Sequence, residues 1–292
     1  MPLEGLCSPT EAWLFYYGWS RVYDVMQPFF TSPEMREAGL DLGEVSGPLA
    51  VLDVGAGTGT LSLQVAARCG ADKLTLLDQS AQMLNQAKEK PALKGCEMKL
   101  SDASTDPLPF ADDSFDRVVS SGVFYYFPRP VEALQEQMRV CRPGGKVLVM
   151  GSLQPKPWLI RLFAQTFNRF PTEEQYLGWF QASGLADIEY KHVSNPWNTQ
   201  QYAIAICGTV PPTGSGKAAA ARPTSESATT SAASGGGGSA FTRRLRSVAY
   251  LPVALARFGL ALAAFAVVGP LQVMNAAAGM RRLRLSQQAE SA

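Results

Sequence analysis

The chain has 292 residues, and its 26 basic and 25 acidic side chains leave a formal net charge of +1. This balance gives no general reason to expect nucleic acid or an acidic partner. The five cysteines lack C-x-x-C spacing and there is one histidine, which predicts reduced, buried thiols and no metal site.

Three regions differ in composition. Residues 1–210 read as one globular domain, and residues 211–240 predict a disordered linker because Gly, Ser, Ala, Thr and Pro dominate them. Residues 241–292 contain a long apolar run. Met1–Thr10 has neither a basic cluster nor an apolar core, so a secretory signal peptide is not expected, and no Arg-rich transit segment is visible.

The first element is an aromatic helix near the N-terminus, with Trp13, Leu14, Tyr17, Val22 and Met26 as its apolar members. These side chains are either core residues or a lid that excludes water from a bound ligand.

A glycine loop follows the first predicted strand. Leu49–Asp53 is a short apolar run that ends in an acid, and Gly55-Ala56-Gly57-Thr58-Gly59 comes after it. Leu61–Cys69 then takes helical spacing, with Gly70 as its stop. Glycines are needed where the backbone turns tightly and approaches a ligand closely, so a nucleotide-like group is expected here.

The next strand, Lys73–Asp78, ends in an acid about twenty residues after the loop, where it can accept hydrogen bonds from both ribose hydroxyls. Ser80 caps a helix that Pro91 ends. A third strand, Glu97–Ser101, brings Asp102 and Ala103 to a position where an acceptor could meet an adenine amino group.

Two further strands are expected at Asp116–Ser121 and Lys146–Met150. A helix from about residue 129 to 141 and a turn at residues 143–145 separate them. Strands alternating with helices predict an α/β fold with a doubly wound, mostly parallel sheet, and Leu185–Val193 with Gln201–Cys207 predicts an antiparallel hairpin at its C-terminal end. The candidate ligand residues follow the carboxyl ends of strands, where open α/β sheets bind ligands.

The loop alone is weak evidence for one cofactor. A dinucleotide fingerprint requires G-x-G-x-x-G, and Thr60 stands where the last Gly or Ala would be. Asp53, two residues before the first glycine, is typical of methyltransferases. S-adenosylmethionine is therefore favoured over a nicotinamide cofactor, which stays the alternative.

Apolar side chains from Leu159 to Phe170 form one helical stripe. The helix either faces the core or has a functional role. In the second case it forms a wall of a lipid-tail pocket or lies on the membrane surface, with Trp158 at the interface. Thr172 and Gln175 predict a capping box for the next helix.

The apolar run near the C-terminus could cross a membrane. Residues 258–280 contain no ionisable group over 23 residues, and at ~1.5 Å per helical residue such a run covers a ~30 Å hydrocarbon core. An interfacial helix and a buried core helix are the alternatives. Arginines flank both sides, so the orientation is undecided.

Several segments together resemble a known family. Val51–Gly59 (VLDVGAGTG), Leu77–Ser80 (LDQS), Ser101–Ala103 (SDA) and Arg142–Gly145 (RPGG) look like successive motifs of class I methyltransferases. Residues 11–26, 120–130 and 170–184 are similar to segments of the plastid 2-methyl-6-phytyl- and 2-methyl-6-solanesylbenzoquinol methyltransferases. A linker and a C-terminal membrane helix also occur in that family, although Ala56 stands where the plant enzymes tend to have another glycine.

The resemblance implies a Rossmann-like fold and S-adenosylmethionine-dependent C-methylation of a prenylated benzoquinol, in tocopherol and plastoquinone biosynthesis, on the chloroplast inner envelope membrane. The residues expected to bind the cofactor are Asp53, Gly55, Gly57, Gly59, Asp78, Gln79, Asp102 and Ala103.

The catalytic candidates are Tyr126 and Asp24, which are predicted to contact the quinol hydroxyls. Tyr125 and Tyr126 could instead be packing or adenine contacts, Asp24 a surface acid, and His192 a structural residue of its strand. The general base stays open. The alternative functions are another small-molecule methyltransferase, acting on a sterol, a lipid or another quinone precursor, and a non-catalytic S-adenosylmethionine-binding membrane protein.

Overall fold

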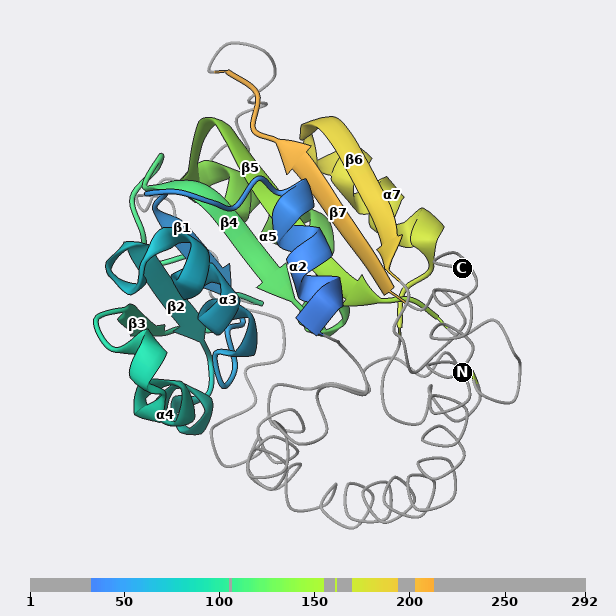
Figure 1. Cartoon of the computed structure of the whole chain (residues 1–292). Helices are drawn as coiled ribbons and strands as arrows, with labels where there is room; N and C mark the ends of the chain where they lie inside the picture. The colour runs from blue at the N-terminus through green and yellow to red at the C-terminus, as the bar shows by residue number, and fades with distance from the viewer. Residues whose placement is uncertain (1–32, 105–106, 155–160, 162–169, 194–202, 213–292) are drawn as a thin grey trace, which may run out of the picture.

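The computed structural model describes residues 33–104, 107–154, 161, 170–193 and 203–212 (Figure 1). The predictions for Asp24, the N-terminal aromatic helix, most of the helical stripe, the linker and the apolar run at 258–280 lie outside these residues. The elements in chain order are α2 (Pro33–Leu42), β1 (Val51–Val54), α3 (Thr60–Cys69), η2 (Ala71–Lys73), β2 (Leu74–Asp78), α4 (Ala81–Glu89), η3 (Pro91–Leu93), β3 (Glu97–Leu100), β4 (Phe115–Ser121), η4 (Phe124–Tyr126), α5 (Pro130–Val140), β5 (Cys141–Ser152), α7 (Glu173–Ser183), β6 (Ala186–Val193) and β7 (Ala203–Thr209).

Seven strands form one sheet in the order β3-β2-β1-β4-β5-β7-β6. The five strands from β3 to β5 in this order run parallel to one another, and β7 runs antiparallel to both β5 and β6. The mostly parallel sheet with an antiparallel C-terminal hairpin is therefore confirmed. The strand order reverses between β1 and β4, and the carboxyl edge at such a switch point is where open α/β sheets bind ligands.

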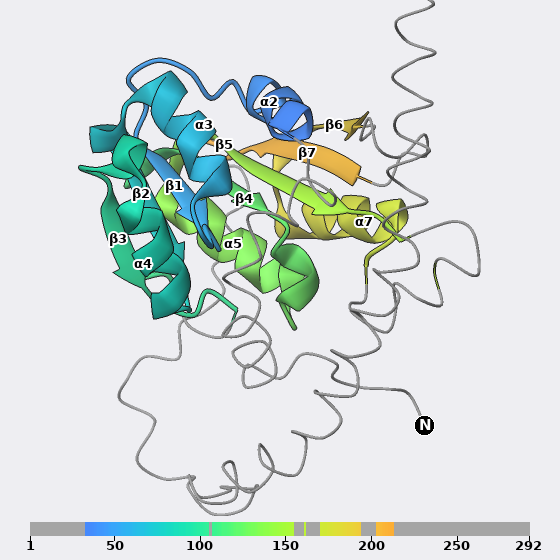
Figure 2. The same ribbon diagram turned by 60° about the horizontal axis from the view of Figure 1, so that its bottom comes forward.

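Helices cover both faces of the sheet. Figure 2 shows α2 and α3 on one side and α5 and α7 on the other. Alternate residues of one strand point into different cores: Leu148 and Met150 of β5 join the core under α2 and α3, while Val147 and Val149 join the core under α5 and α7. A strand buried on both faces needs a continuous apolar run, and β5 has one at residues 147–150.

The predicted turn at residues 143–145 is wrong. The structure continues β5 through it, and the pairing with β4 shifts from Phe115↔Cys141 to Arg117↔Lys146. Gly144 has φ +76°, and a Cβ on Gly145 would lie 2.7 Å from the Asp116 carbonyl oxygen. The Pro-Gly-Gly sequence thus forms a bulge inside a strand rather than a turn before one.

The helix ends follow the predicted signals. The Ser80 hydroxyl accepts a hydrogen bond from Met83 N–H at the start of α4. Thr172 and Gln175 form the reciprocal capping box of α7. Gly70, with φ +92°, ends α3.

The described cysteines are unpaired, as expected from the sequence. Cys69, Cys141 and Cys207 are buried and Cys96 is half-buried. Burial raises the pKa of Cys141 to about 12 and that of Cys207 to about 11, so both thiols are unreactive near neutral pH.

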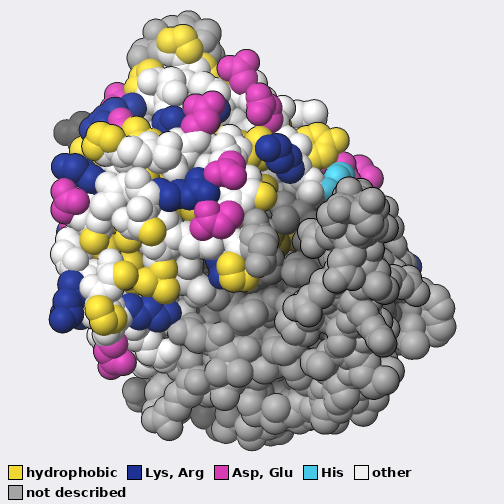
Figure 3. Space-filling model, viewed as in Figure 1, with side chains coloured by type: hydrophobic (Ala, Val, Ile, Leu, Met, Phe, Trp, Pro, Cys, Tyr) yellow, Lys and Arg dark blue, Asp and Glu magenta, His cyan; other side chains and the backbone are white. Residues whose placement is uncertain are grey.

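On the face shown in Figure 3, acidic and basic side chains are interspersed rather than gathered by sign. This arrangement agrees with the net charge of +1. Among the described residues, none of the helices has the length and apolar character needed to cross a bilayer.

Close packing of β5 against α7 makes the first testable prediction. A Cβ on Gly151 would lie 2.0 Å from the hydroxyl oxygen of Tyr176, a fully buried side chain whose hydroxyl has no hydrogen-bond partner among the described residues. Because overpacking a core is unfavourable, Gly151→Ala should lower the free energy of unfolding by about 1–3 kcal/mol in urea titrations. Tyr176→Phe should change it little, since it removes an unpaired buried hydroxyl.

The double variant is the control. It should recover part of the loss, because the nearest atom to the new methyl group is gone while the ring Cζ stays 2.7 Å away. Equal stability of Gly151→Ala and the wild type would contradict this account of the β5–α7 contact.

Candidate functional site

The glycine loop lies at the carboxyl end of β1, next to the switch point. Gly55, Gly57 and Gly59 have φ of 73°, 58° and 79°, a region that favours glycine. A Cβ on Gly55 would lie 2.6 Å from Val123, and one on Gly59 would lie 2.6 Å from Leu93. A Cβ on Gly57 would meet nothing within 4 Å, so the loop has two glycines required by packing and one facing open space.

Four of the loop's backbone N–H groups are already bonded within the protein. Gly55 N–H and Ala56 N–H both donate to the Leu77 carbonyl oxygen, at 2.8 and 3.0 Å. Gly57 N–H donates to Asp78 Oδ2 at 2.8 Å. Gly59 N–H donates to the Ala56 carbonyl oxygen at 2.9 Å. The loop is therefore held to the end of β2 by its own N–H groups.

Asp53 lies under the loop and is 1% exposed. The Ser62 hydroxyl, in the first turn of α3, donates to Asp53 Oδ2 at 2.6 Å. Burial raises the pKa of Asp53 to about 7; the bond from Ser62 opposes the rise and the negative charge of Asp78 adds to it. The sequence indicated Asp53 but not Ser62, because no local pattern shows that a serine in a helix will donate to a carboxylate in the strand before it.

Asp78 ends β2 and accepts hydrogen bonds through both of its oxygens. Ser80 N–H donates to Oδ1 and Gly57 N–H to Oδ2, each at 2.8 Å. Burial raises the pKa of Asp78; the N–H donors oppose the rise, and the nearby Asp102 adds to it. The structure thus brings Asp53 and Asp78 together beside the loop, as the sequence predicted.

The other cofactor candidates lie beside Asp78. Gln79 is exposed, and Ala103 is half-buried against the core under α5 and α7. Asp102 Oδ1 accepts hydrogen bonds from the N–H and the hydroxyl of Ser104, at 2.9 and 2.6 Å. The eight predicted residues therefore occupy the carboxyl ends of β1, β2 and β3.

A lysine that the sequence did not single out supports the loop. Lys90 Nζ donates to the Thr58 carbonyl oxygen at 2.7 Å, and the Thr58 side chain is fully buried. Lys90 follows α4, so this bond joins the end of that helix to the loop 32 residues earlier. No local pattern predicts such a contact.

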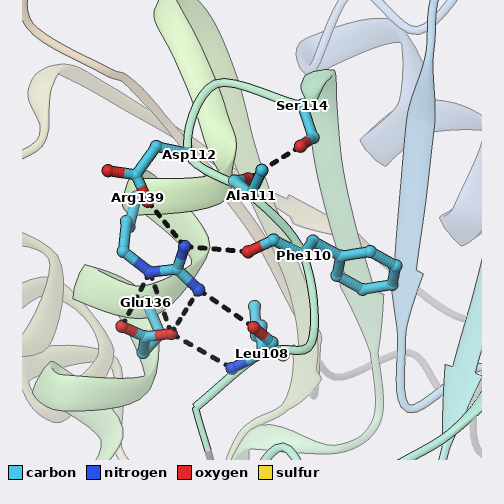
Figure 4. A network of polar contacts seen from close by, with 7 residues as sticks. All are labelled: Leu108, Phe110, Ala111, Asp112, Ser114, Glu136 and Arg139. Carbon is cyan, nitrogen blue, oxygen red and sulfur yellow. Dashed lines mark hydrogen bonds and ion pairs between the residues drawn. The ribbon is translucent and has the colours of Figure 1, made fainter.

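The connection from β3 to β4 is clamped onto α5 by Arg139 (Figure 4). Arg139 donates to the carbonyl oxygens of Leu108 and Phe110 at 3.0 and 2.9 Å and pairs with Asp112 at 2.7 Å. Glu136 Oε2 accepts from Arg139 and from Leu108 N–H. Burial opposes ionisation of Glu136, but these bonds outweigh it and lower the pKa of the carboxyl. The network fixes the far end of the connection that begins at Asp102.

Tyr125 and Tyr126 lie in η4, directly after β4, and both are half-buried. Their ring centroids are 4.6 Å apart. Phe124 and Phe127, whose ring centroids are 4.9 Å apart, are buried and anchor the turn in the core. Because Val123 packs on Gly55, the two tyrosines belong to the same edge as the glycine loop.

The only histidine is farther away. His192 Nε2 lies 2.8 Å from Glu173 Oε2, so it joins β6 to the start of α7. β6 is four strands from β1, which is about 19 Å at ~4.8 Å per strand. This position supports the structural interpretation of His192, and Asp24 lies outside the described residues.

Comparisons with known proteins agree with this geometry. Residues 51–145 match the family model described as a methyltransferase domain. The chain is 41% identical over 189 residues to 2-methyl-6-phytyl-1,4-hydroquinone methyltransferase 2, chloroplastic, of Oryza sativa subsp. japonica, covering 64% of this chain and 54% of that protein. It is 39% identical over 189 residues to the enzyme of the same description from Arabidopsis thaliana, covering 64% and 55%. The chain thus spans about half the length of these relatives.

A solved structure shares the fold. A putative methyltransferase of Haloferax volcanii, in complex with the Trm112 methyltransferase activator, superposes with a TM-score of 0.58 at 19% identity, covering 68% of this chain and 96% of that one. Together with the strand order, this likeness identifies the class I, Rossmann-like methyltransferase fold.

The buried acid under the loop predicts a pH dependence of stability. The folded-state pKa of Asp53, about 7, lies above the ordinary value of about 3.9. Between these pH values the folded chain keeps a proton that the unfolded chain has lost, so this carboxyl makes stability fall as pH rises from about 4 to about 7. Asp53→Asn should flatten the fall by up to roughly 1.4 kcal/mol per pH unit, measured by urea unfolding at pH 5, 6 and 7.

Asp72→Asn is the matched control, because Asp72 is exposed in η2. Its pH profile should follow that of the wild type. A profile for Asp53→Asn that also parallels the wild type would mean that Asp53 ionises normally.

Proposed function

We propose that this chain, whose residues 51–145 match a methyltransferase domain, uses S-adenosylmethionine to C-methylate a prenylated benzoquinol in tocopherol and plastoquinone biosynthesis. The similarity to the plant hydroquinone methyltransferases supports the substrate class. The observation that carries the proposal is the acid-lined glycine loop at the switch point, where Gly57 faces open space beside Asp78.

The loop suits a cationic ligand better than a dinucleotide. A pyrophosphate needs free N–H donors, but those of Gly55, Ala56 and Gly57 are already bonded within the protein. Asp53 and Asp78 lie beside the loop, and a nearby pyrophosphate would disfavour their ionised forms further, adding to the rise that burial already causes in the pKa of both carboxyl groups. A sulfonium and an ammonium group would instead favour their ionised forms.

The residues also fit the neutral parts of S-adenosylmethionine. Asp78, at the end of β2, is the acceptor for the ribose hydroxyls, and Asp102, after β3, is the acceptor for the adenine amino group. Gly57 has room for the ligand against its Cα. Gln79 and Ala103 flank the adenine position.

Bound S-adenosylmethionine supplies an electrophilic methyl group. The chain has to hold a ring carbon of the quinol in line with the carbon–sulfur bond, at about 3–3.5 Å, which contributes about 7–11 kcal/mol through orientation. Methyl transfer would leave the sulfur as a neutral thioether, and the proton of the ring carbon would pass to solvent water. Removing a proton from the neighbouring hydroxyl makes that carbon electron-rich.

Tyr126 and Asp24 are the groups that we propose to contact the quinol hydroxyls. Tyr126 is half-buried in η4, directly after β4 and beside the glycine loop, which supports its part in the assignment. The assignment of Asp24 rests on the sequence.

The location proposed for the chain is the chloroplast inner envelope membrane. The plant relatives are described as chloroplastic, which supports the organelle. Residues 258–280 are proposed to cross the membrane, and residues 211–240 to link this anchor to the domain at 1–210. A prenylated quinol is itself dissolved in the bilayer, so an anchor would keep the domain near its substrate.

The activity can be tested with purified full-length chain, methyl-labelled S-adenosylmethionine and a chemically reduced 2-methyl-6-phytylbenzoquinol. Label should appear on a ring carbon of the product. Asp78→Ala should weaken binding of S-adenosylmethionine about 10- to 100-fold in calorimetry, since hydrogen bonds to a charged group are lost.

Asp72→Ala, an exposed acid at the other end of β2, is the control and should bind normally. Binding without labelling of any quinol would refute the activity. Labelling of a sterol or a phospholipid base instead would refute the substrate class.

The anchor predicts how the chain fractionates. Full-length chain made in cells should stay with the membrane pellet after an alkaline carbonate wash, because a spanning helix is not released by it. A chain ending at residue 240 should appear in the supernatant. Release of the full chain by carbonate, with retention at neutral pH, would contradict a span and favour an interfacial helix.

A further inference from the structure

Three aromatic side chains from two distant parts of the chain contact one another. Tyr125 and Tyr126 belong to η4, and Phe170 precedes α7. The ring centroids of Tyr125 and Phe170 are 5.4 Å apart at an interplanar angle of 73°. Those of Tyr125 and Tyr126 are 4.6 Å apart at 60°. Tyr125 is therefore the central ring, which both others contact edge-on.

The position of Phe170 is fixed by the two residues that follow it in sequence. Gln154 N–H, just after β5, donates to the Pro171 carbonyl oxygen at 2.9 Å. The next residue, Thr172, is held by the capping box of α7. Phe170 is thus presented to Tyr125 by the end of a strand and the start of a helix.

The hydroxyl of Tyr125 lies over the backbone at the end of β4. A Cβ on Gly122 would lie 3.3 Å from the Tyr125 hydroxyl oxygen, and Gly122 has φ +71°. Gly122 is followed by Val123, which packs on Gly55. The Tyr125 hydroxyl therefore lies near the glycine loop, at the switch point of the sheet.

We infer that Phe170 and Tyr125 form the subsite that orients the aromatic ring of the acceptor, with Phe170 as a positioning and specificity-determining residue. This inference rests on the proposed function, since it assigns the ring-binding part of the same site. Half-buried aromatic rings set edge-on to one another offer both faces and edges to a flat aromatic ligand. The Tyr125 hydroxyl is placed to hydrogen-bond a ring oxygen of that ligand.

Phe170 acts through Tyr125 in this arrangement. Removing its ring takes away one of the ring contacts that hold Tyr125 beside Gly122, which should loosen the acceptor without touching Asp78 or the glycine loop.

The test compares Phe170→Leu with Phe170→Tyr in the full-length chain. With reduced 2-methyl-6-phytylbenzoquinol as acceptor, Phe170→Leu should raise KM for the quinol about 2- to 10-fold, the range that an aromatic contact accounts for. The dissociation constant for S-adenosylmethionine should stay within about twofold of wild type. Phe170→Tyr keeps the ring, so its KM for the quinol should equal that of the wild type. Tyr125→Phe removes the hydroxyl that orients the acceptor and should lower kcat.

Phe110→Leu is the matched control. Phe110 is a half-buried aromatic in another edge-on pair, with Phe115 at 5.0 Å, but Phe115 starts β4 and so lies at the opposite edge of the sheet. Its KM for the quinol should equal that of the wild type.

The outcomes are distinguishable. A wild-type chain that methylates no quinol refutes the proposed function itself. An active wild type with an unchanged KM in Phe170→Leu refutes the subsite alone. A loss in Phe170→Leu that is matched by Phe110→Leu, or that follows a fall in melting temperature or in S-adenosylmethionine affinity, assigns Phe170 a purely structural role and also refutes the subsite.

Discussion

The hydrogen bond from Gly57 N–H to Asp78 Oδ2 joins the two features on which the site depends. It holds the glycine loop after β1 against the acid at the end of β2. The bonds from Gly55 N–H and Ala56 N–H to the Leu77 carbonyl oxygen hold the same loop to the same strand. The carboxylate is thereby kept where a ligand can meet it, while the N–H groups that would attract a phosphate are satisfied. In the function that we propose, this short stretch of backbone sets both the place of S-adenosylmethionine and the preference for a positive charge beside the loop.

The parts of the fold that local sequence encodes were predictable. Strand ends, the helix after Gly59, the Ser80 cap and the Thr172–Gln175 capping box depend on residues within a few positions of one another. The antiparallel hairpin was also predictable, since both of its strands are strongly patterned. The cofactor candidates could be found because a glycine loop and acids at successive strand ends are tied to chain order, and parallel strands place their carboxyl ends on one edge.

Contacts between distant segments were not predictable. Lys90 reaches Thr58 across 32 residues, and both α5 and β5 lie between Tyr125 and Phe170 in the chain, so neither pair has a local pattern. The bulge at residues 143–145 was mistaken for a turn because Pro-Gly-Gly is common in turns, and only pairing with β4 shows that the strand continues. The assignments of Asp24 and of the run at 258–280 stay predictions, since both lie outside the described residues.

The bond between Gln154 and Pro171 has a consequence for how the chain tolerates changes in length. It holds together the residues on either side of the intervening stretch, at the end of β5 and just before α7. Insertions and deletions there leave the strand before it and the helix after it in register. Changes in the length or composition of that stretch would therefore leave the scaffold on either side of it intact.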